Sequence, residues 1–153
     1  KIPEESSRGL YKCRLLYDLV IDEVELEPYV RKRIRSLKLV YEDRLSYGYK
    51  YSDRSQLNEL FKRRLGCDDI LIVQNGLLTD SCYANVVLWD GKGWYTPDTP
   101  LLPGTRRAAL LEKGEIIEAR IHAGMIPQFT EIRLINALND LEEAPRIRTS
   151  LIV

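Results

Sequence analysis

The sequence predicts an α+β protein built on a mixed, mostly antiparallel β-sheet or barrel with flanking helices. Segments with strand-like alternation outnumber those with helical periodicity, and most neighbouring strand segments are joined by hairpin signals. The chain has 153 residues, of which 44% are hydrophobic, so it can bury one core of ordinary size.

Strand-like segments dominate the first third of the chain. They cover residues 10–26 and 30–41, and a third, short strand is expected at about 47–51. The second segment alternates a more polar and a more apolar set of side chains, which is typical of a strand with one buried face.

A helix is expected to follow the third strand. Asp53 is a suitable N-cap because its carboxylate can accept a backbone N–H, and Gln56 lies three residues further on. Gly66 is expected to end this helix. The predicted apolar stripe consists of Leu57, Leu60, Phe61 and Leu65.

Two hairpins are predicted in the middle of the chain. Strands at 69–74 and 77–80 flank Asn75-Gly76, which is the strongest short hairpin signal because both residues tolerate a positive φ. Strands at 86–90 and 94–96 are expected to pair in the same way across a glycine-rich turn.

The last third is expected to hold one helix and two further strands. The helix should run from about residue 104 to 113 and end at Gly114. The strands at 116–121 and 131–137 should complete the sheet region.

Composition excludes several classes of function. Lys plus Arg and Asp plus Glu both number 23, so no net charge favours nucleic acid or an anionic membrane. No apolar run reaches about 18 residues. Cys13, Cys67 and Cys82 lack metal-ligand spacing, so we predict no metal site and expect reduced thiols in a cytoplasmic protein.

Two segments carry the functional signal. Residues 78–107 read LTDSCYANVVLWDGKGWYTPDTPLLPGTRR, with an acid after a tight hairpin, an Asn five residues later and a Gly-Thr pair opening a helix. Residues 48–61 read GYKYSDRSQLNELF. Together they resemble the class IV aminotransferases and the related 4-amino-4-deoxychorismate lyases. The resemblance implies the large C-terminal domain of the fold-type IV enzymes that bind pyridoxal 5′-phosphate (PLP), similar to D-amino-acid aminotransferase.

The resemblance implies that Lys50 is the lysine that carries PLP, since an arginine follows four residues later and then a helix. A lysine held among aromatic rings loses hydration, which lowers its pKa and makes a neutral amine available. From the residues alone, a lysine on a solvated strand face is the better interpretation of Lys50, and it is the resemblance that favours the cofactor lysine.

The resemblance gives Asp80 the place of a family glutamate, whose carboxylate keeps the PLP ring nitrogen protonated. Asp80 and Lys50 are therefore the predicted catalytic residues. The alternative for Asp80 is an acid that caps local amides at the end of a hairpin. Asn85, five residues later, is expected to position neighbouring backbone or to touch the ring, or to be a simple turn residue.

The resemblance also implies a phosphate site. Gly104 and Thr105 open a helix, whose first N–H groups and positive dipole end suit a dianion. Asn136 and Ala137 match, more loosely, a small-residue turn that makes a second phosphate contact in the family.

The resemblance implies a domain organisation and an activity. Residues 1–26 would be the remnant end of a small N-terminal domain, and residues 27–153 the PLP-binding large domain. The expected protein is a homodimeric enzyme acting on a small-molecule amino substrate, either a lyase that eliminates pyruvate or an aminotransferase, with a slight preference for the lyase. The alternative is a non-catalytic descendant of the fold that binds a ligand or a partner.

Overall fold

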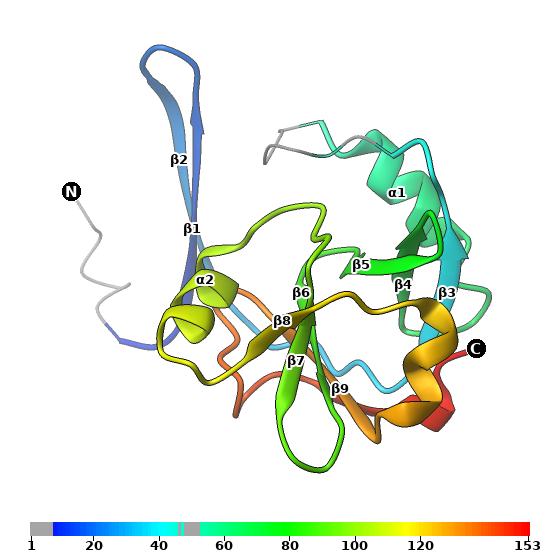
Figure 1. Ribbon diagram of the computed structural model, residues 1–153. Coiled ribbons are helices and arrows are strands. Elements are labelled where there is room, and N and C mark those ends of the chain that lie inside the picture. The colour runs from blue at the N-terminus through cyan, green and yellow to red at the C-terminus, as the bar shows by residue number, and fades with distance from the viewer. Residues whose placement is uncertain (1–7, 46, 48–52) are drawn as a thin grey trace. The chain divides into compact units, whose positions relative to one another are not determined.

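The computed structural model describes residues 8–45, 47 and 53–153 of the chain (Figure 1). It divides into two compact units, residues 1–32 and residues 33–153. The domain limits inferred from the resemblance, 1–26 and 27–153, stay a prediction.

The first unit is a β-hairpin. Its strands are β1 (Tyr11–Tyr17) and β2 (Ile21–Pro28), which pair in antiparallel fashion. The sequence prediction of one strand-like segment over 10–26 was wrong, because the chain reverses at residues 18–20, where the Asp18 N–H donates to Val20 O. Residues 18–20 include neither glycine nor proline, so the sequence lacked the usual signal for a turn at this point.

The second unit is built on a mixed sheet of eight strands within the described residues. Along its main path the order is β10-β9-β6-β5-β4-β3, and β7 joins β6 to β8. The β3–β4 and β7–β8 pairs are parallel and the others are antiparallel, which confirms the predicted fold class. The strands are β3 (Leu37–Tyr41), β4 (Asp69–Gln74), β5 (Leu77–Ser81), β6 (Asn85–Trp89), β7 (Trp94–Pro97), β8 (Ile117–Ala119), β9 (Glu131–Ile135) and β10 (Arg146–Arg148).

Two α-helices flank this sheet, as Figure 1 shows. Helix α1 (Ser55–Lys62) lies beside β3 and β4, and α2 (Thr105–Glu112) lies near β6 and β8. Two short 3₁₀ helices, η2 (Ala123–Gln128) and η3 (Thr149–Leu151), lie in the C-terminal part of the chain. The helices therefore flank the sheet as predicted.

The predicted turn at Asn75-Gly76 is confirmed. Asn75 has a φ of 49° and Gly76 a φ of 80°, the pair of positive values that a two-residue type I′ hairpin requires. The turn joins β4 to β5, and β5 ends at the residues of the candidate site.

Helix α1 differs from the prediction at both ends. The Asp53 carboxylate accepts the Ser55 N–H at 2.8 Å, but the N-cap position itself is Arg54. The helix ends at Lys62, and Leu65 is 79% exposed, so its predicted place in the apolar stripe was wrong. A helix that ends three residues earlier no longer holds Leu65 on its buried face.

Strand β4 explains how one sheet supports two cores. Leu71 and Val73 point into a cluster with β6 and β9, whereas Ile70 and Ile72 point to the other face. There they pack with Leu57 and Leu60 of α1. All four β4 side chains are fully buried, as expected of a strand covered on both faces.

Two other expectations were wrong or fall outside the described residues, and one strand was not predicted. Only Leu37–Tyr41 of the predicted strand 30–41 is regular. The predicted strand at 47–51 lies outside the described residues except for Tyr47. Strand β10 was missed because it has three residues, two of them arginines, and forms only by pairing with β9.

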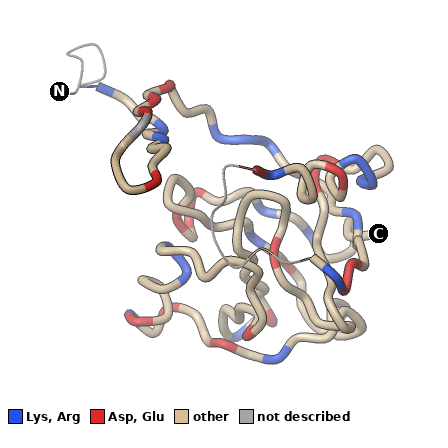
Figure 2. The backbone as a smooth tube through the Cα atoms, turned by 90° about the horizontal axis from the view of Figure 1, so that it is seen from above, with Lys and Arg blue, Asp and Glu red and all other residues tan. Residues whose placement is uncertain are grey.

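The surface carries both signs of charge. Figure 2 shows basic and acidic positions interspersed along the backbone of residues 33–153, in line with equal numbers of the two kinds. In the described ranges no helix is both long and apolar enough to cross a membrane. The same ranges contain no cluster of three or more His, Cys, Asp or Glu side chains placed to hold a metal ion.

Candidate cofactor site

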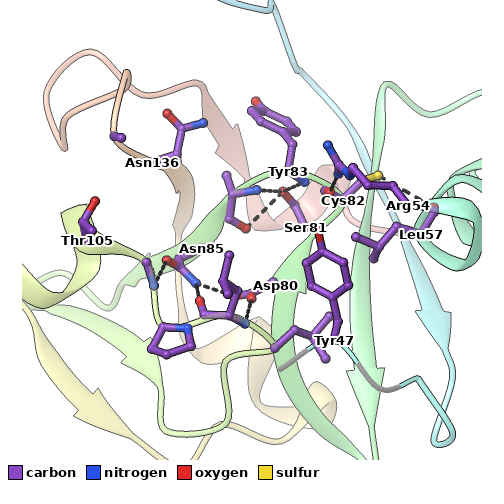
Figure 3. Close-up of a pocket in the computed structure, with 16 residues that line it drawn as sticks. Tyr47, Arg54, Leu57, Asp80, Ser81, Cys82, Tyr83, Asn85, Thr105 and Asn136 are labelled. Atoms are coloured by element: carbon purple, nitrogen blue, oxygen red, sulfur yellow. Dashed lines mark hydrogen bonds between the residues drawn. The ribbon is translucent and has the colours of Figure 1, made fainter. Parts of the chain in front are cut away.

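A pocket of about 330 Å³ opens where the ends of β5 and β9 meet the start of α2 (Figure 3). It lies wholly within the second unit and is mostly apolar, with a few polar groups that converge on it, as is typical of a site for a small ligand. Its lining consists of Tyr47, Arg54, Leu57, Asp80, Ser81, Cys82, Tyr83, Ala84, Asn85, Leu101, Leu102, Pro103, Gly104, Thr105, Asn136 and Ala137.

Asp80 is the buried acid of this pocket. It pairs directly with Asn85 across β5 and β6, and its side chain is 5% exposed. One carboxylate oxygen accepts the Asn85 side-chain N–H at 2.8 Å and the other accepts the Leu102 backbone N–H at 3.0 Å. The carboxylate is thus fixed from two sides while it still faces the pocket.

The surroundings of Asp80 leave its negative charge under-compensated. Burial raises the pKa of its carboxyl from 3.8 to about 6. Hydrogen bonds from Asn85, Leu102 and Leu101 and the positive charge of Arg107 act in the opposite direction but do not outweigh burial. A cationic N–H placed beside this carboxylate would supply what it lacks.

We expect Asp80 to make the cofactor-free protein less stable as the pH rises from about 4 to about 6. The folded protein holds this proton more tightly than the unfolded chain, which titrates near 3.8, so raising the pH through this interval reduces the free energy of unfolding by about 3 kcal/mol. Asp80→Asn does not titrate and should lose this component. Urea unfolding of both proteins at several pH values measures it, and parallel pH curves would contradict the prediction.

Asn85 joins Asp80 to the segment that leads into α2. Its side-chain nitrogen donates to Asp80 and to the Leu102 carbonyl, both at 2.8 Å. Its side-chain oxygen accepts the Gly104 backbone N–H at 3.1 Å. Of the roles considered for Asn85, the contacts match the one in which it positions neighbouring backbone.

The start of α2 lies on the wall of the pocket. The first N–H groups of a helix have no acceptor within the helix, and Gly104, at the N-cap position, provides no side-chain acceptor for them. The Gly104 N–H donates to Asn85 and the Ala108 N–H donates to the Gly104 carbonyl, so the backbone N–H groups of Thr105, Arg106 and Arg107 are the ones available to an anion. Thr105 is exposed and contributes a hydroxyl at the same edge.

The turn after β9 forms the neighbouring edge. Asn136 shapes this turn, because its side-chain oxygen accepts the backbone N–H groups of Leu138 and Asn139 at 2.9 and 3.0 Å. Ala137 is exposed and lines the pocket. An ion pair of 3.0 Å between Arg106 of α2 and Asp140 ties the two edges together.

The opposite side of the pocket in Figure 3 carries Arg54 and Tyr47. The Arg54 guanidinium donates to the Cys82 carbonyl at 2.6 Å, which connects the start of α1 to the turn between β5 and β6. Lys50, the predicted cofactor lysine, lies outside the described residues.

The pocket thus brings together six of the seven predicted site residues, namely Asp80, Asn85, Gly104, Thr105, Asn136 and Ala137. Sequence reasoning did not identify the contributions of Tyr47, Leu57, Cys82, Tyr83 and Leu102. Cys82 and Tyr83 lie in the short turn between Asp80 and Asn85. This position in the sequence could have indicated that they line the same site.

A sequence model of the family described as Amino-transferase class IV matches residues 28–143. This chain belongs to the class IV aminotransferase family. The match includes strand β5 with Asp80, the start of α2 and the turn after β9, all of which line the pocket.

Two similar proteins come from Haemophilus species. An uncharacterized protein of Haemophilus influenzae is 43% identical over 141 residues, which are 92% of this chain and 75% of that protein. The crystal structure of a protein from Haemophilus somnus, provisionally assigned as a 4-amino-4-deoxychorismate lyase, is 42% identical with a TM-score of 0.83. That match covers 87% of this chain and 69% of the other.

A structure with lower sequence identity is similar to this chain in fold. A hypothetical aminotransferase from Mycobacterium tuberculosis in its PLP-bound form is 18% identical, with a TM-score of 0.64. The match covers 81% of this chain and 52% of that one.

Proposed function

We propose that this chain binds PLP in the pocket and acts as a lyase of the 4-amino-4-deoxychorismate type. One observation carries the proposal. The same cavity is lined by the buried Asp80 carboxylate, whose negative charge is only partly compensated, and by the start of α2, whose first N–H groups have no side-chain cap. These two groups complement the two charged ends of PLP. The 42% identical relative favours the lyase over the aminotransferase.

Asp80 would face the ring nitrogen of the cofactor. PLP withdraws electrons from a bound substrate most strongly while that nitrogen is protonated. Asp80 holds the proton there because its carboxylate, fixed by Asn85 and Leu102, is buried and gains a cationic partner. The raised pKa of the Asp80 carboxyl in the cofactor-free protein fits this role, because the site is short of positive charge.

The start of α2 and the turn after β9 would hold the phosphate. The backbone N–H groups of the first turn, Thr105 to Arg107, carry partial positive charge, and the Thr105 hydroxyl adds a donor. Ala137 leaves room for an anion at the second edge. The Arg106–Asp140 ion pair keeps the two edges at a fixed spacing.

Lys50 would carry the cofactor and move the substrate proton. Its place in residues 48–61 supports this assignment by resemblance to the family strand. Lys50 would be the residue bonded to the cofactor, and its amine, once the substrate amine has replaced it in that bond, would accept the proton from the substrate carbon. Apolar and aromatic walls, including Leu57 and Tyr83, would limit the access of water.

The test uses the purified full-length protein with added PLP. We expect a visible absorbance band from covalently bound cofactor, and release of pyruvate when 4-amino-4-deoxychorismate is added. Protein reduced with borohydride is the control, because reduction fixes the cofactor to the chain and should abolish turnover.

Each other outcome has its own meaning. Transfer of an amino group to a 2-oxo acid without pyruvate release would make the protein an aminotransferase. Bound PLP with neither activity would support the non-catalytic descendant, and a protein that fails to bind PLP would overturn the proposal.

A further inference from the structure

The close approach of Gly104 to Asn85 is the tightest backbone requirement in the pocket. A Cβ added at Gly104 would overlap the Asn85 side-chain oxygen and lie 3.5 Å from its Cγ. The backbone of Gly104 itself is ordinary, with φ −71° and ψ 151°, values that any residue adopts. The need for glycine at this position therefore comes from Asn85 and not from the backbone conformation.

The orientation of the Asn85 amide is determined by its partners. Both N–H groups have acceptors, the Asp80 carboxylate and the Leu102 carbonyl, and the oxygen has a donor, the Gly104 N–H. A flipped amide would place N–H against N–H at Gly104 and oxygen against oxygen at Asp80. Since Asn85 is 6% exposed, water cannot substitute for these partners.

We propose that Asn85 is a positioning residue that couples the two ends of the cofactor site, holding the Asp80 carboxylate and the segment that opens α2 in one hydrogen-bonded unit. Gly104 has no side chain because this unit needs the space. The inference rests on the proposed function for its catalytic meaning, but the coupling itself belongs to the chain and exists without cofactor.

The coupling has two expected consequences. Losing the Asn85 amide frees the Gly104 N–H and the segment before Thr105, so the phosphate end should loosen. It also removes a donor that lowers the pKa of the Asp80 carboxyl, so that carboxyl should titrate above about 6. Arg107, from α2, is the charged side chain of the described residues that also acts on Asp80, and it is left in place.

The test is a double-mutant cycle on the cofactor-free full-length protein. Gly104→Ala should lower the Tm by about 5 °C when Asn85 is present, because the added methyl displaces the Asn85 oxygen and breaks its part-buried hydrogen bond to the Gly104 N–H. In the Asn85→Ala background the same substitution should change the Tm little, since the atom it displaces is gone. If Asn85→Ala does not fold, Asn85→Ser provides the shortened side chain.

Gly124→Ala is the matched control. Gly124 has an ordinary φ, and an added Cβ meets no atom within 4 Å, so the Tm should stay unchanged. If Gly104→Ala lowers the Tm equally in the wild-type and Asn85→Ala backgrounds, the coupling is overturned, because the loss of stability would then not come from the clash with Asn85.

A second measurement separates positioning from mere stability. The titration of the Asp80 carboxyl, followed by ¹³C NMR in the cofactor-free protein, should move to higher pH in Asn85→Ala but not in Gly124→Ala. PLP affinity of Asn85→Ala should fall by about tenfold. Additive Tm values or an unmoved titration would overturn the inference, whereas a wild-type protein that binds no PLP would overturn only the proposed function.

Discussion

Lys50→Ala is expected to abolish covalent attachment of PLP and to reduce turnover by about 10³-fold or more, since it removes both the amine that carries the cofactor and the base that moves the substrate proton. The measurement is mass spectrometry after borohydride reduction, which adds the mass of the cofactor to the modified peptide. Non-covalent binding of PLP should persist, because the groups proposed to hold the phosphate are unchanged.

Lys62→Ala is the control for Lys50→Ala. Lys62 lies on α1, and its ammonium pairs with Glu59 on an exposed face, so its removal should leave labelling and turnover as they were. Undiminished labelling in Lys50→Ala would assign the cofactor to a different lysine. The resemblance of residues 48–61 to the family strand would then be accidental.

The sequence predicted those elements of the fold whose conformation depends on neighbouring residues in the chain. Asn75-Gly76 fixed a hairpin because the turn type requires two positive φ values at adjacent residues. The strand predicted at 69–74, before this turn, is confirmed as β4 with the same bounds. Strand β10 depends instead on pairing with residues of β9 that lie 13 to 17 positions earlier in the sequence, so no local pattern predicted it.

The candidate site likewise has features that follow from short sequence motifs and features that depend on contacts between distant segments. The order of acid, asparagine and Gly-Thr predicted Asp80, Asn85 and Thr105 as site residues, and the structure places all three in the lining of one pocket. The sequence could not show that the Gly104 N–H is used by Asn85, since that contact spans 19 residues and depends on the path of the segment between β7 and α2. The contribution of Tyr47 likewise arises only when distant segments meet.

The role of the buried acid predicts a second large effect. Asp80→Asn should leave the protein folded and able to bind PLP, while lowering the rate of proton removal from the substrate by about 10²-fold. An amide at this position is neutral and cannot hold a positive charge on the ring nitrogen. Turnover per bound cofactor, measured together with the Tm on one preparation, isolates the chemical effect from loss of protein or cofactor.

Asp80→Glu supplies the comparison that distinguishes charge from packing. It keeps the carboxylate and restores the residue that the family resemblance expects, so it should retain more turnover than Asp80→Asn even if its Tm falls. A longer side chain must displace the Asn85 and Leu102 contacts, which makes some loss of stability expected. If Asp80 only caps the end of β5, Asp80→Asn should lower the Tm and leave turnover per bound cofactor unchanged. That result would remove Asp80 from the catalytic site and favour the non-catalytic descendant, because the pocket would then hold a buried carboxylate that no reaction uses.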